Sequence, residues 1–401
     1  MPATSWVPIS DSDPFGAHTL PYGVFSTVGE DPRVGAAIGS YVLDLAPLAA
    51  VENLEGGHVF AQRTLNSFMA LGPQAWTAVR GWLTELVRDE AQRDLVEPHL
   101  VPVADVRLHM PFDIADYVDF YSSQCHAENV GKILRPDSPA LPPAWRHLPI
   151  GYHGRAGTVV ASGTDIVRPW GLRRAGDEVK YGPSERLDIE AEVGFVVGVP
   201  SELGSPVPVS AFADRVFGVV LVNDWSARDI QAFEYVPLGP FLGKSFATSI
   251  SPWVVPLAAL EEARVAPPRR DPEPAPHLRD DEPWGLALEL EVSWNGTTVA
   301  RPPFAAMYWT AAQQLAHLTA NGASLRCGDL YASGTVSGPE RDQRGSFLEL
   351  SWNGTEPVRL ADGSTRSFLE DGDEVTISAT APGPDGTRIQ LGAVTGRIIP
   401  A

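Results

Sequence analysis

The chain has 401 residues, of which 44% are hydrophobic and 11 are tryptophan, so it can bury a large interior. Because single hydrophobic cores usually stop growing at about 250 to 300 residues, this length predicts two domains. The 50 acidic and 30 basic residues give a formal net charge of -20, which disfavours nucleic acid and anionic membrane surfaces as partners.

Cysteine usage and hydropathy point to one compartment. Only Cys125 and Cys327 are present, too few for a disulfide framework or a thiolate metal cage. No stretch reaches the roughly 20 apolar residues that span a bilayer, and the N-terminal segment lacks the apolar run of a signal peptide. We therefore expect a cytoplasmic protein with no membrane partner.

The first part of the chain predicts short strands and one long helix. Val34–Ile38 and Tyr41–Leu45 are apolar runs bounded by turn-forming residues, which is typical of strands. Over residues 73–88, apolar side chains recur every three or four positions, which predicts a helix with one buried face. These positions are Trp76, Val79, Leu83 and Leu86. Two prolines follow the helix, and we divide the chain there into residues 1–112 and 113–401.

The second part predicts mostly strands and hairpins. Three dipeptides between β-forming runs are typical of tight turns with positive φ: Asn295-Gly296, Asn353-Gly354 and Asp371-Gly372. The first two belong to repeated Ser-Trp-Asn-Gly-Thr segments, which we interpret as one hairpin used twice rather than as a domain repeat. A helical pattern over residues 310–320 ends at Asn321-Gly322. The predicted fold class is therefore mainly β with inserted helices (α+β).

Residues 187–195, Leu-Asp-Ile-Glu-Ala-Glu-Val-Gly-Phe, alternate polar and apolar side chains. Side chains two apart lie on one face of a strand, so Asp188, Glu190 and Glu192 are expected to point the same way. Three like charges repel one another, and a cation would relieve that repulsion. The alternative is a half-exposed strand with a charged outer face.

A further carboxylate, Asp224, follows the continuous apolar run Val216–Val222, which is typical of a strand buried on both faces. The polar residues after this run are spaced four, three and four apart, so on a helix they would form one stripe. They are Asp224, Arg228, Gln231 and Tyr235. The alternative is a capping Asp with an ordinary ion pair to Arg228.

The third polar segment runs from Asp119 to His126 and leads into a predicted helix capped by Ser122 or Ser123. A single histidine is more often packed or solvated than catalytic, so His126 needs partners. The acidic residues of the three segments would together form an all-carboxylate set: Asp119, Glu190, Glu192 and Asp224. Such ligands suit Ca²⁺, Mg²⁺ or Mn²⁺ rather than Zn²⁺ or Cu²⁺.

Seven segments spread along the chain carry distinctive motifs: Leu20–Ser26, Thr64–Met69, Asp119–Ser123, Leu148–Arg155, Asn223–Gln231, Glu234–Phe246 and Ala332–Glu340. Through these motifs and their order, the chain resembles the fumarylacetoacetase family over almost its whole length. The resemblance implies a small N-terminal SH3-like β-barrel, a large C-terminal mixed β-roll and a homodimer. It also implies metal-dependent hydrolysis of a carbon–carbon bond in 4-fumarylacetoacetate, the last step of tyrosine and phenylalanine catabolism through homogentisate, with no organic cofactor.

The resemblance also implies roles for individual residues by family position. The metal residues are Asp119, Glu190, Glu192 and Asp224, with Lys244 and Thr248 next to an ion that is Ca²⁺ or Mg²⁺, Mn²⁺ being a further candidate. The catalytic residues are His126 as general base, Glu349 as the group that orients it, and Arg228, Gln231 and Lys244 as oxyanion donors. The substrate-binding residues are Tyr121, Arg135, Tyr152, Tyr235 and Thr335. Strand alternation over residues 347–351 would set Glu349 toward a cleft, opposite Leu348 and Leu350.

One departure and two alternatives accompany this resemblance. Gln124 and Cys125 precede His126, whereas Arg and Gln precede the histidine in the animal enzymes, so a charge is lost beside the site. Another dioxo-acid hydrolase of the same superfamily, such as an acylpyruvase, would share the carboxylate site, although those chains are usually shorter. A catalytically inactive metal-binding protein would not need His126 and Glu349 together.

Overall fold

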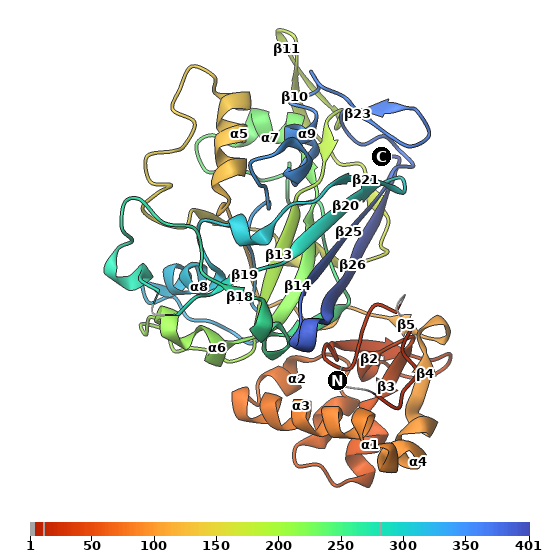
Figure 1. Ribbon diagram of the computed structural model, residues 1–401. Helices are drawn as coiled ribbons and strands as arrows, with labels where there is room; N and C mark the ends of the chain where they lie inside the picture. Colours follow the sequence, from red (N-terminus) through yellow and green to blue (C-terminus); the bar gives the residue numbers. More distant parts are fainter. Residues whose placement is uncertain (1–4, 11–12, 281) are drawn as a thin grey trace.

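The computed structural model describes residues 5–10, 13–280 and 282–401 (Figure 1). Strands predominate and nine α-helices are inserted among the described residues, which confirms the predicted α+β class. The helices are α1 (Leu45–Val51), α2 (Asn66–Met69), α3 (Pro73–Arg88), α4 (Arg93–Val96), α5 (Gln124–Leu134), α6 (Phe212–Arg215), α7 (Arg228–Glu234), α8 (Ala311–Thr319) and α9 (Phe347–Leu350). In the part of the chain described, no helix is long and apolar enough to cross a membrane.

The largest sheet has 13 strands and carries the candidate site. Its main path is β4 (Leu100–Pro102), β3 (Tyr41–Asp44), β2 (Arg33–Ile38), β1 (Tyr22–Ser26), β17 (Trp253–Pro256), β14 (Val216–Asp224), β13 (Ala191–Val197), β22 (Leu330–Ala332), β6 (Tyr117–Phe120) and β7 (Gly151–His153). Off this path lie β5 (Arg107–Leu108), β8 (Val159–Ala161) and β16 (Thr248–Ile250). Every residue of β14 is buried, as the apolar run predicted.

A second sheet packs on the first. Its order is β21 (Thr297–Ala300), β20 (Glu289–Trp294), β25 (Glu374–Pro382), β26 (Arg388–Ile399) and β9 (Ile166–Val167). Figure 1 shows β25 and β26 running alongside β13 and β14. Buried residues alternate along β25 and, together with apolar side chains of β13 and β14, belong to the largest core cluster. The candidate site therefore lies on strands that are held in place by the core between the two sheets.

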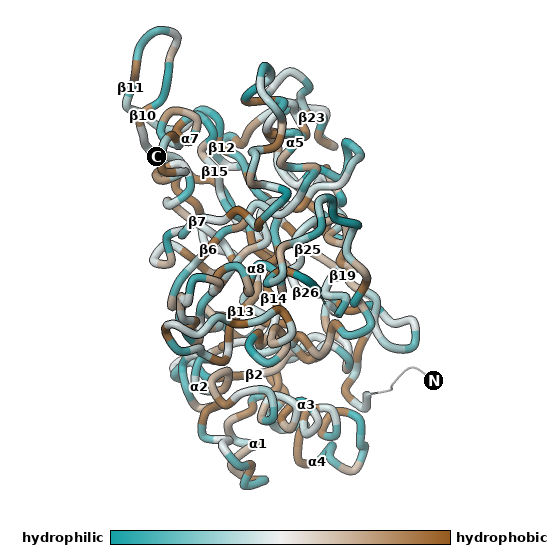
Figure 2. Tube along the Cα trace, turned by 90° about the vertical axis from the view of Figure 1, so that its left-hand side faces the viewer, coloured by the Kyte–Doolittle hydropathy of each residue, from teal (hydrophilic) through white to brown (hydrophobic). Residues whose placement is uncertain are grey.

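Four short strand pairs complete the β structure: β10 (Trp170–Ala175) with β11 (Glu178–Pro183), β12 (Leu187–Asp188) with β15 (Ser226–Ala227), β18 (Arg264–Val265) with β19 (Gly285–Leu286), and β23 (Val358–Arg359) with β24 (Thr365–Arg366). The β10–β11 hairpin projects from the body of the molecule (Figure 2). Its inner face packs on α7, because Gly171 lies directly against Ile230. Its outer face is apolar and exposed.

The N-terminal strands join the large sheet. β1 pairs with β17 through Tyr22↔Val254 and Gly23↔Trp253, and the described N-terminal strands do not close on themselves. The SH3-like barrel is therefore not confirmed in this part of the chain, and the domain division at residue 112 stays a prediction. The helix predicted over residues 73–88 is confirmed as α3, with Val79, Leu83 and Leu86 buried.

The turn predictions had mixed outcomes. Asn295-Gly296 joins the paired strands β20 and β21 with φ of 48° and 74°, as expected of a primed turn. The hairpin predicted at Asn353-Gly354 is wrong, because these left-handed residues end α9, and the Asn353 N–H donates to the Leu348 carbonyl (2.8 Å). Asp371-Gly372 joins β24 to β25, which lie in different sheets, so that hairpin is also wrong.

A pair of helical glycines offers a test of packing around the site. Replacing a helical glycine by alanine usually stabilises a protein by about 0.5–1 kcal/mol, and Gly81 of α3, whose added Cβ would meet nothing, should follow this rule. The same replacement at Gly131 of α5 should lower stability, since the added Cβ would overlap the backbone carbonyl of Ala140. We expect Gly131→Ala to destabilise by about 1–3 kcal/mol in urea unfolding. A stabilised Gly131→Ala would show that α5 does not pack against this segment.

Candidate active site and metal centre

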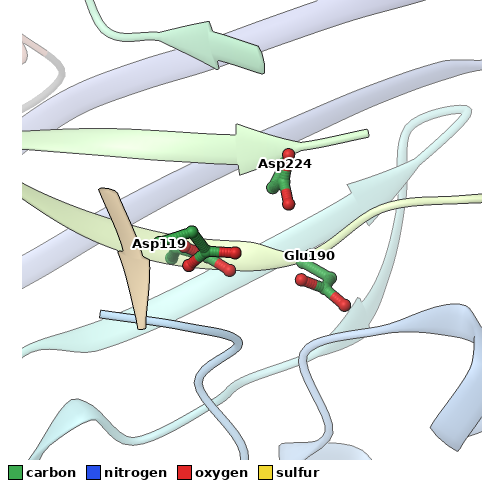
Figure 3. Close-up of side chains that lie close together, drawn as sticks. Asp119, Glu190 and Asp224 are labelled. Atoms are coloured by element: carbon green, nitrogen blue, oxygen red, sulfur yellow. The ribbon is translucent and has the colours of Figure 1, made fainter. Parts of the chain in front are cut away.

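Four carboxylates meet where the central strands end. Asp119 lies in β6, Glu192 in β13 and Asp224 at the end of β14, while Glu190 directly precedes β13. Antiparallel pairing places Ala191 opposite Asn223, which brings the acidic residues of β13 and β14 to one edge. One oxygen from each of the four carboxylates lies within 4.8 Å of all the others. Figure 3 shows Asp119, Glu190 and Asp224 gathered from three neighbouring segments.

This cluster lacks protein partners for several oxygens. Both carboxylate oxygens of Glu192 and Oδ1 of Asp119 are buried without a hydrogen-bond partner among the described residues. Burial and the neighbouring carboxylates raise the pKa of Glu192 and of Asp119 well above their usual values. Unpartnered buried carboxylates are costly, and hard oxygen ligands suit divalent cations of the Mg²⁺ and Ca²⁺ type. The donor set therefore fits such a cation.

Lys244 bridges two members of the cluster. Its Nζ lies 2.6 Å from Oε2 of Glu190 and 2.7 Å from Oδ2 of Asp224. Burial alone would lower the pKa of Lys244, but the charges of these two carboxylates outweigh burial and raise it. An ammonium group has no lone pair to offer a metal, so Lys244 fits a place beside the ion. Thr248 is close by, and its Oγ1 donates to Oδ1 of Asp224 (3.1 Å).

His126 has a side-chain partner, which a catalytic role for this histidine needs. It lies in the first turn of α5, where Ser123 caps the helix by accepting from the His126 N–H (3.2 Å). The imidazole Nδ1 lies 2.7 Å from Oε2 of Glu349. Since Glu349 occupies Nδ1, the imidazole atom available to a ligand is Nε2. This is the arrangement of a base held by a third group.

Glu349 is held in turn by three further donors. Ser337 and Ser346 donate to Oε2 (2.9 and 2.8 Å), and Asn129 donates to Oε1 (2.9 Å). Burial alone would raise the pKa of Glu349, but His126 and these hydrogen bonds hold it below its usual value. The expected strand around Glu349 is wrong, because residues 347–350 form helix α9 with Ser346 as its cap. The Ser-x-x-Glu spacing is a capping signal that could have identified this helix from the sequence.

A cavity of about 750 Å³ opens onto both the base and the acidic cluster. Among the predicted site residues, those that line it are Asp119, Tyr121, His126, Arg135, Tyr152, Glu190, Arg228, Gln231, Tyr235, Lys244 and Thr335. The Oγ1 of Thr335 is buried there without a described partner. Four predicted site residues are not among the lining residues: Glu192, Asp224, Thr248 and Glu349. Glu349 faces His126 rather than the expected cleft.

Two local expectations needed correction. The strand expected over residues 187–195 is interrupted between β12 and β13, and it is buried rather than half-exposed. Asp188 therefore does not join Glu190 and Glu192, but bonds to Arg228 instead. The single helical stripe is also wrong, since Asp224 ends β14 while α7 begins at Arg228.

The residues that precede His126 lie away from the cavity lining described above. Gln124 donates from Nε2 to Oε1 of Glu128 (2.8 Å) along the surface of α5. Cys125 is half-buried, and burial raises the pKa of its thiol, which disfavours a nucleophilic thiolate.

Comparison with solved structures defines the fold class. A fumarylacetoacetate hydrolase from Exiguobacterium antarcticum superposes with a TM-score of 0.56 at 16% identity, covering 96% of this chain and all of that one. A maleylpyruvate hydrolase from Sphingobium gives a TM-score of 0.54 at 15% identity, covering 95% of this chain and all of the other. The chain thus has the fold of these hydrolases.

Sequence comparison narrows the class to one family. The model of the fumarylacetoacetase N-terminal region matches residues 18–111, and that of the fumarylacetoacetate hydrolase C-terminal region matches residues 116–399. Human fumarylacetoacetase is 48% identical over 99% of both chains, and the Arabidopsis thaliana enzyme is 44% identical over 99% of this chain and 98% of its own. The chain belongs to the fumarylacetoacetase family.

Proposed function

We infer that this protein is a fumarylacetoacetase, which hydrolyses a carbon–carbon bond of 4-fumarylacetoacetate to give fumarate and acetoacetate. Its full-length relatives carry that name at 41–48% identity. One observation supports the proposed catalytic chemistry: the His126–Glu349 pair and the four-carboxylate cluster adjoin a single cavity. The reaction would close the breakdown of tyrosine and phenylalanine through homogentisate.

The acidic cluster is proposed to hold the metal ion. Asp119, Glu190, Glu192 and Asp224 would supply oxygen ligands, and Lys244 would balance part of their charge. When bound there, Mg²⁺ or Ca²⁺ supplies Lewis-acid stabilisation for negative charge on substrate oxygens. Mn²⁺ accepts the same ligand type and is a third candidate.

The protein residues would perform the proton transfers. His126 removes a proton from water through Nε2, and the hydroxide adds to the carbonyl carbon on the fumaroyl side of the substrate. The charge of Glu349 stabilises the imidazolium that forms. The adduct then breaks its carbon–carbon bond, the hydroxyl group stays with fumarate, and the proton held by His126 passes to the departing carbon of acetoacetate. The water is thereby fully accounted for.

Three donors are proposed to stabilise the oxyanion formed by this addition. Arg228 lines the cavity with a buried Nη2 that has no described partner. Gln231 accepts from Arg228 through Oε1 (3.1 Å), which leaves its Nε2 as a donor. Lys244 is the third donor. Five further lining residues would bind the substrate carboxylates and dioxo unit: Tyr121, Arg135, Tyr152, Tyr235 and Thr335.

Removal of the metal tests the proposal directly. We expect a chelator to abolish the loss of fumarylacetoacetate absorbance, and Mg²⁺ or Ca²⁺ to restore it. The same ions should raise the stability of the folded protein by about 2.7 kcal/mol at a concentration 100 times the dissociation constant. Full activity after verified metal removal would contradict the role of the cluster. A folded, metal-loaded protein without turnover would favour another dioxo-acid hydrolase activity.

The assembly and location of the protein are part of the same proposal. The outer face of the β10–β11 hairpin exposes Trp170, Leu172, Val179 and Tyr181, with exposed fractions from 48% to 69%. A contiguous apolar face of this kind is typical of a protein interface and supports a homodimer. The cysteine content supports a cytoplasmic location.

A further inference from the structure

Asp188 lies outside the metal cluster, and its carboxylate accepts four hydrogen bonds. The side chain is wholly buried. Its Oδ1 accepts from the backbone N–H groups of Ile189 (2.8 Å) and Phe347 (2.7 Å). Its Oδ2 accepts from the N–H of Leu348 (3.0 Å) and from Nε of Arg228 (2.8 Å). One carboxylate therefore joins two separate parts of the cavity wall.

The first part is helix α9, which carries Glu349. Phe347 and Leu348 are its first two residues, and the N–H groups at the start of a helix have no partner within the helix. Asp188 supplies that partner for both. Because α9 has only four residues, a change at its first turn moves Glu349 directly, and with it the hydrogen bond to Nδ1 of His126.

The second part is the guanidinium group of Arg228. Its Nε donates to Oδ2 of Asp188, and its Nη1 lies 2.8 Å from Oε1 of Glu190, so carboxylates fix two edges of the planar group. The Nη2 is then the nitrogen left for a ligand, and it is buried without a described partner. The orientation of this donor depends on both anchors, since either alone would let the plane turn.

We propose that Asp188 is a positioning residue for hydrolysis. By bonding to α9 and to Arg228, it keeps the general base His126, its partner Glu349 and the oxyanion donor Arg228 in fixed relative positions. The inference rests on the proposed function of this site. Asp188 itself does not line the cavity, so it acts through the residues that it holds.

The variant Asp188→Asn tests this role while preserving shape. An amide presents NH₂ on one side, which would face two N–H donors. Helix α9 therefore loses one of its two acceptors in either orientation of the amide, and Arg228 loses its acceptor in one of them. A misplacement of about 1 Å can cost about 10²-fold in rate, and we expect kcat for fumarylacetoacetate to fall about 10²-fold, with a smaller change in KM. The metal-dependent rise in thermal stability should persist, because Asp188 contacts none of the four cluster carboxylates through a hydrogen bond.

Asp373→Asn is the matched control. Asp373 is 5% exposed and accepts from Nδ2 of Asn295 (2.7 Å) and the N–H of Glu370 (2.8 Å), away from the cavity lining. Its loss should lower thermal stability but leave kcat of the folded enzyme unchanged. Wild-type kcat in Asp188→Asn would overturn the inference, as would an equal fall in both variants. If Asp188→Asn does not fold, Asp188→Ser is measured against the same outcomes.

A readout without turnover separates this inference from the proposed function. The proton between Nδ1 of His126 and Glu349 is expected far downfield in the proton NMR spectrum, because the hydrogen bond is short and charge-assisted. Asp188→Asn should shift or abolish this signal, and Asp373→Asn should retain it. An unchanged signal in Asp188→Asn would overturn the link to Glu349. Failure of the wild-type protein to hydrolyse fumarylacetoacetate would instead overturn the proposed function.

Discussion

His126→Ala is expected to lower kcat for fumarylacetoacetate by about 10²–10⁴-fold, the usual contribution of a positioned general base. The imidazole is the group held by Glu349 at the cavity wall, and alanine leaves no proton acceptor there. The metal site should survive, because the four clustered carboxylates lie outside α5 and form no hydrogen bond with His126. Steady-state kinetics and a metal-dependent thermal shift, measured on the same preparation, check both halves of this expectation.

Two comparisons make the result specific. His153→Ala removes an exposed histidine that pairs with Asp116 at 3.0 Å, and it should leave kcat near the wild-type value. Glu349→Gln should also lower kcat, because the amide cannot stabilise an imidazolium. Groups that act as a unit are strongly non-additive, so the double variant should be little slower than His126→Ala alone. Substantial activity in His126→Ala would contradict its assignment as the base.

Glu192→Gln is expected to abolish metal binding at ordinary metal concentrations, and turnover with it. Glu192 is wholly buried, and neither of its carboxylate oxygens has a described protein partner. Glutamine keeps the volume but removes one negative charge and presents NH₂ where an oxygen ligand stood. Titration calorimetry with Mg²⁺ and Ca²⁺ should therefore show binding to the wild-type protein and none to the variant.

Measurements of stability with and without metal test the Glu192→Gln prediction in a second way. Without metal, the variant should be at least as stable as the wild type, because it relieves crowding among buried acids. With metal, only the wild type should gain stability. Asp44→Asn is the control, since Asp44 is a buried acid outside the cluster, paired with Arg33 at 2.7 Å, and its loss should leave the metal response intact. A wild-type protein with no metal response would contradict the metal site itself.

Local periodicity predicted some elements well and others poorly. The helix over residues 73–88 was predictable because its apolar spacing matches one buried face, and the fully buried strand β14 because its run is continuous. The same reasoning failed at Glu349, where two apolar neighbours fit a strand as well as a helix. It failed again at Asp188, because an interruption of the strand turns this carboxylate away from Glu190 and Glu192.

The sequence alone determined the family, the fold class and the residue types available for chemistry, since these follow from motifs, composition and spacing within short segments. Tertiary structure decided which side chains meet. The carboxylates of β13 and β14 converge because antiparallel pairing aligns the ends of these two strands, and β6 joins them through β22, with which it pairs in parallel. It also decided that Asp188 joins Arg228 to α9. Periodicity reports which face of an element is buried, whereas the partner on that face is chosen only when the sheets pack.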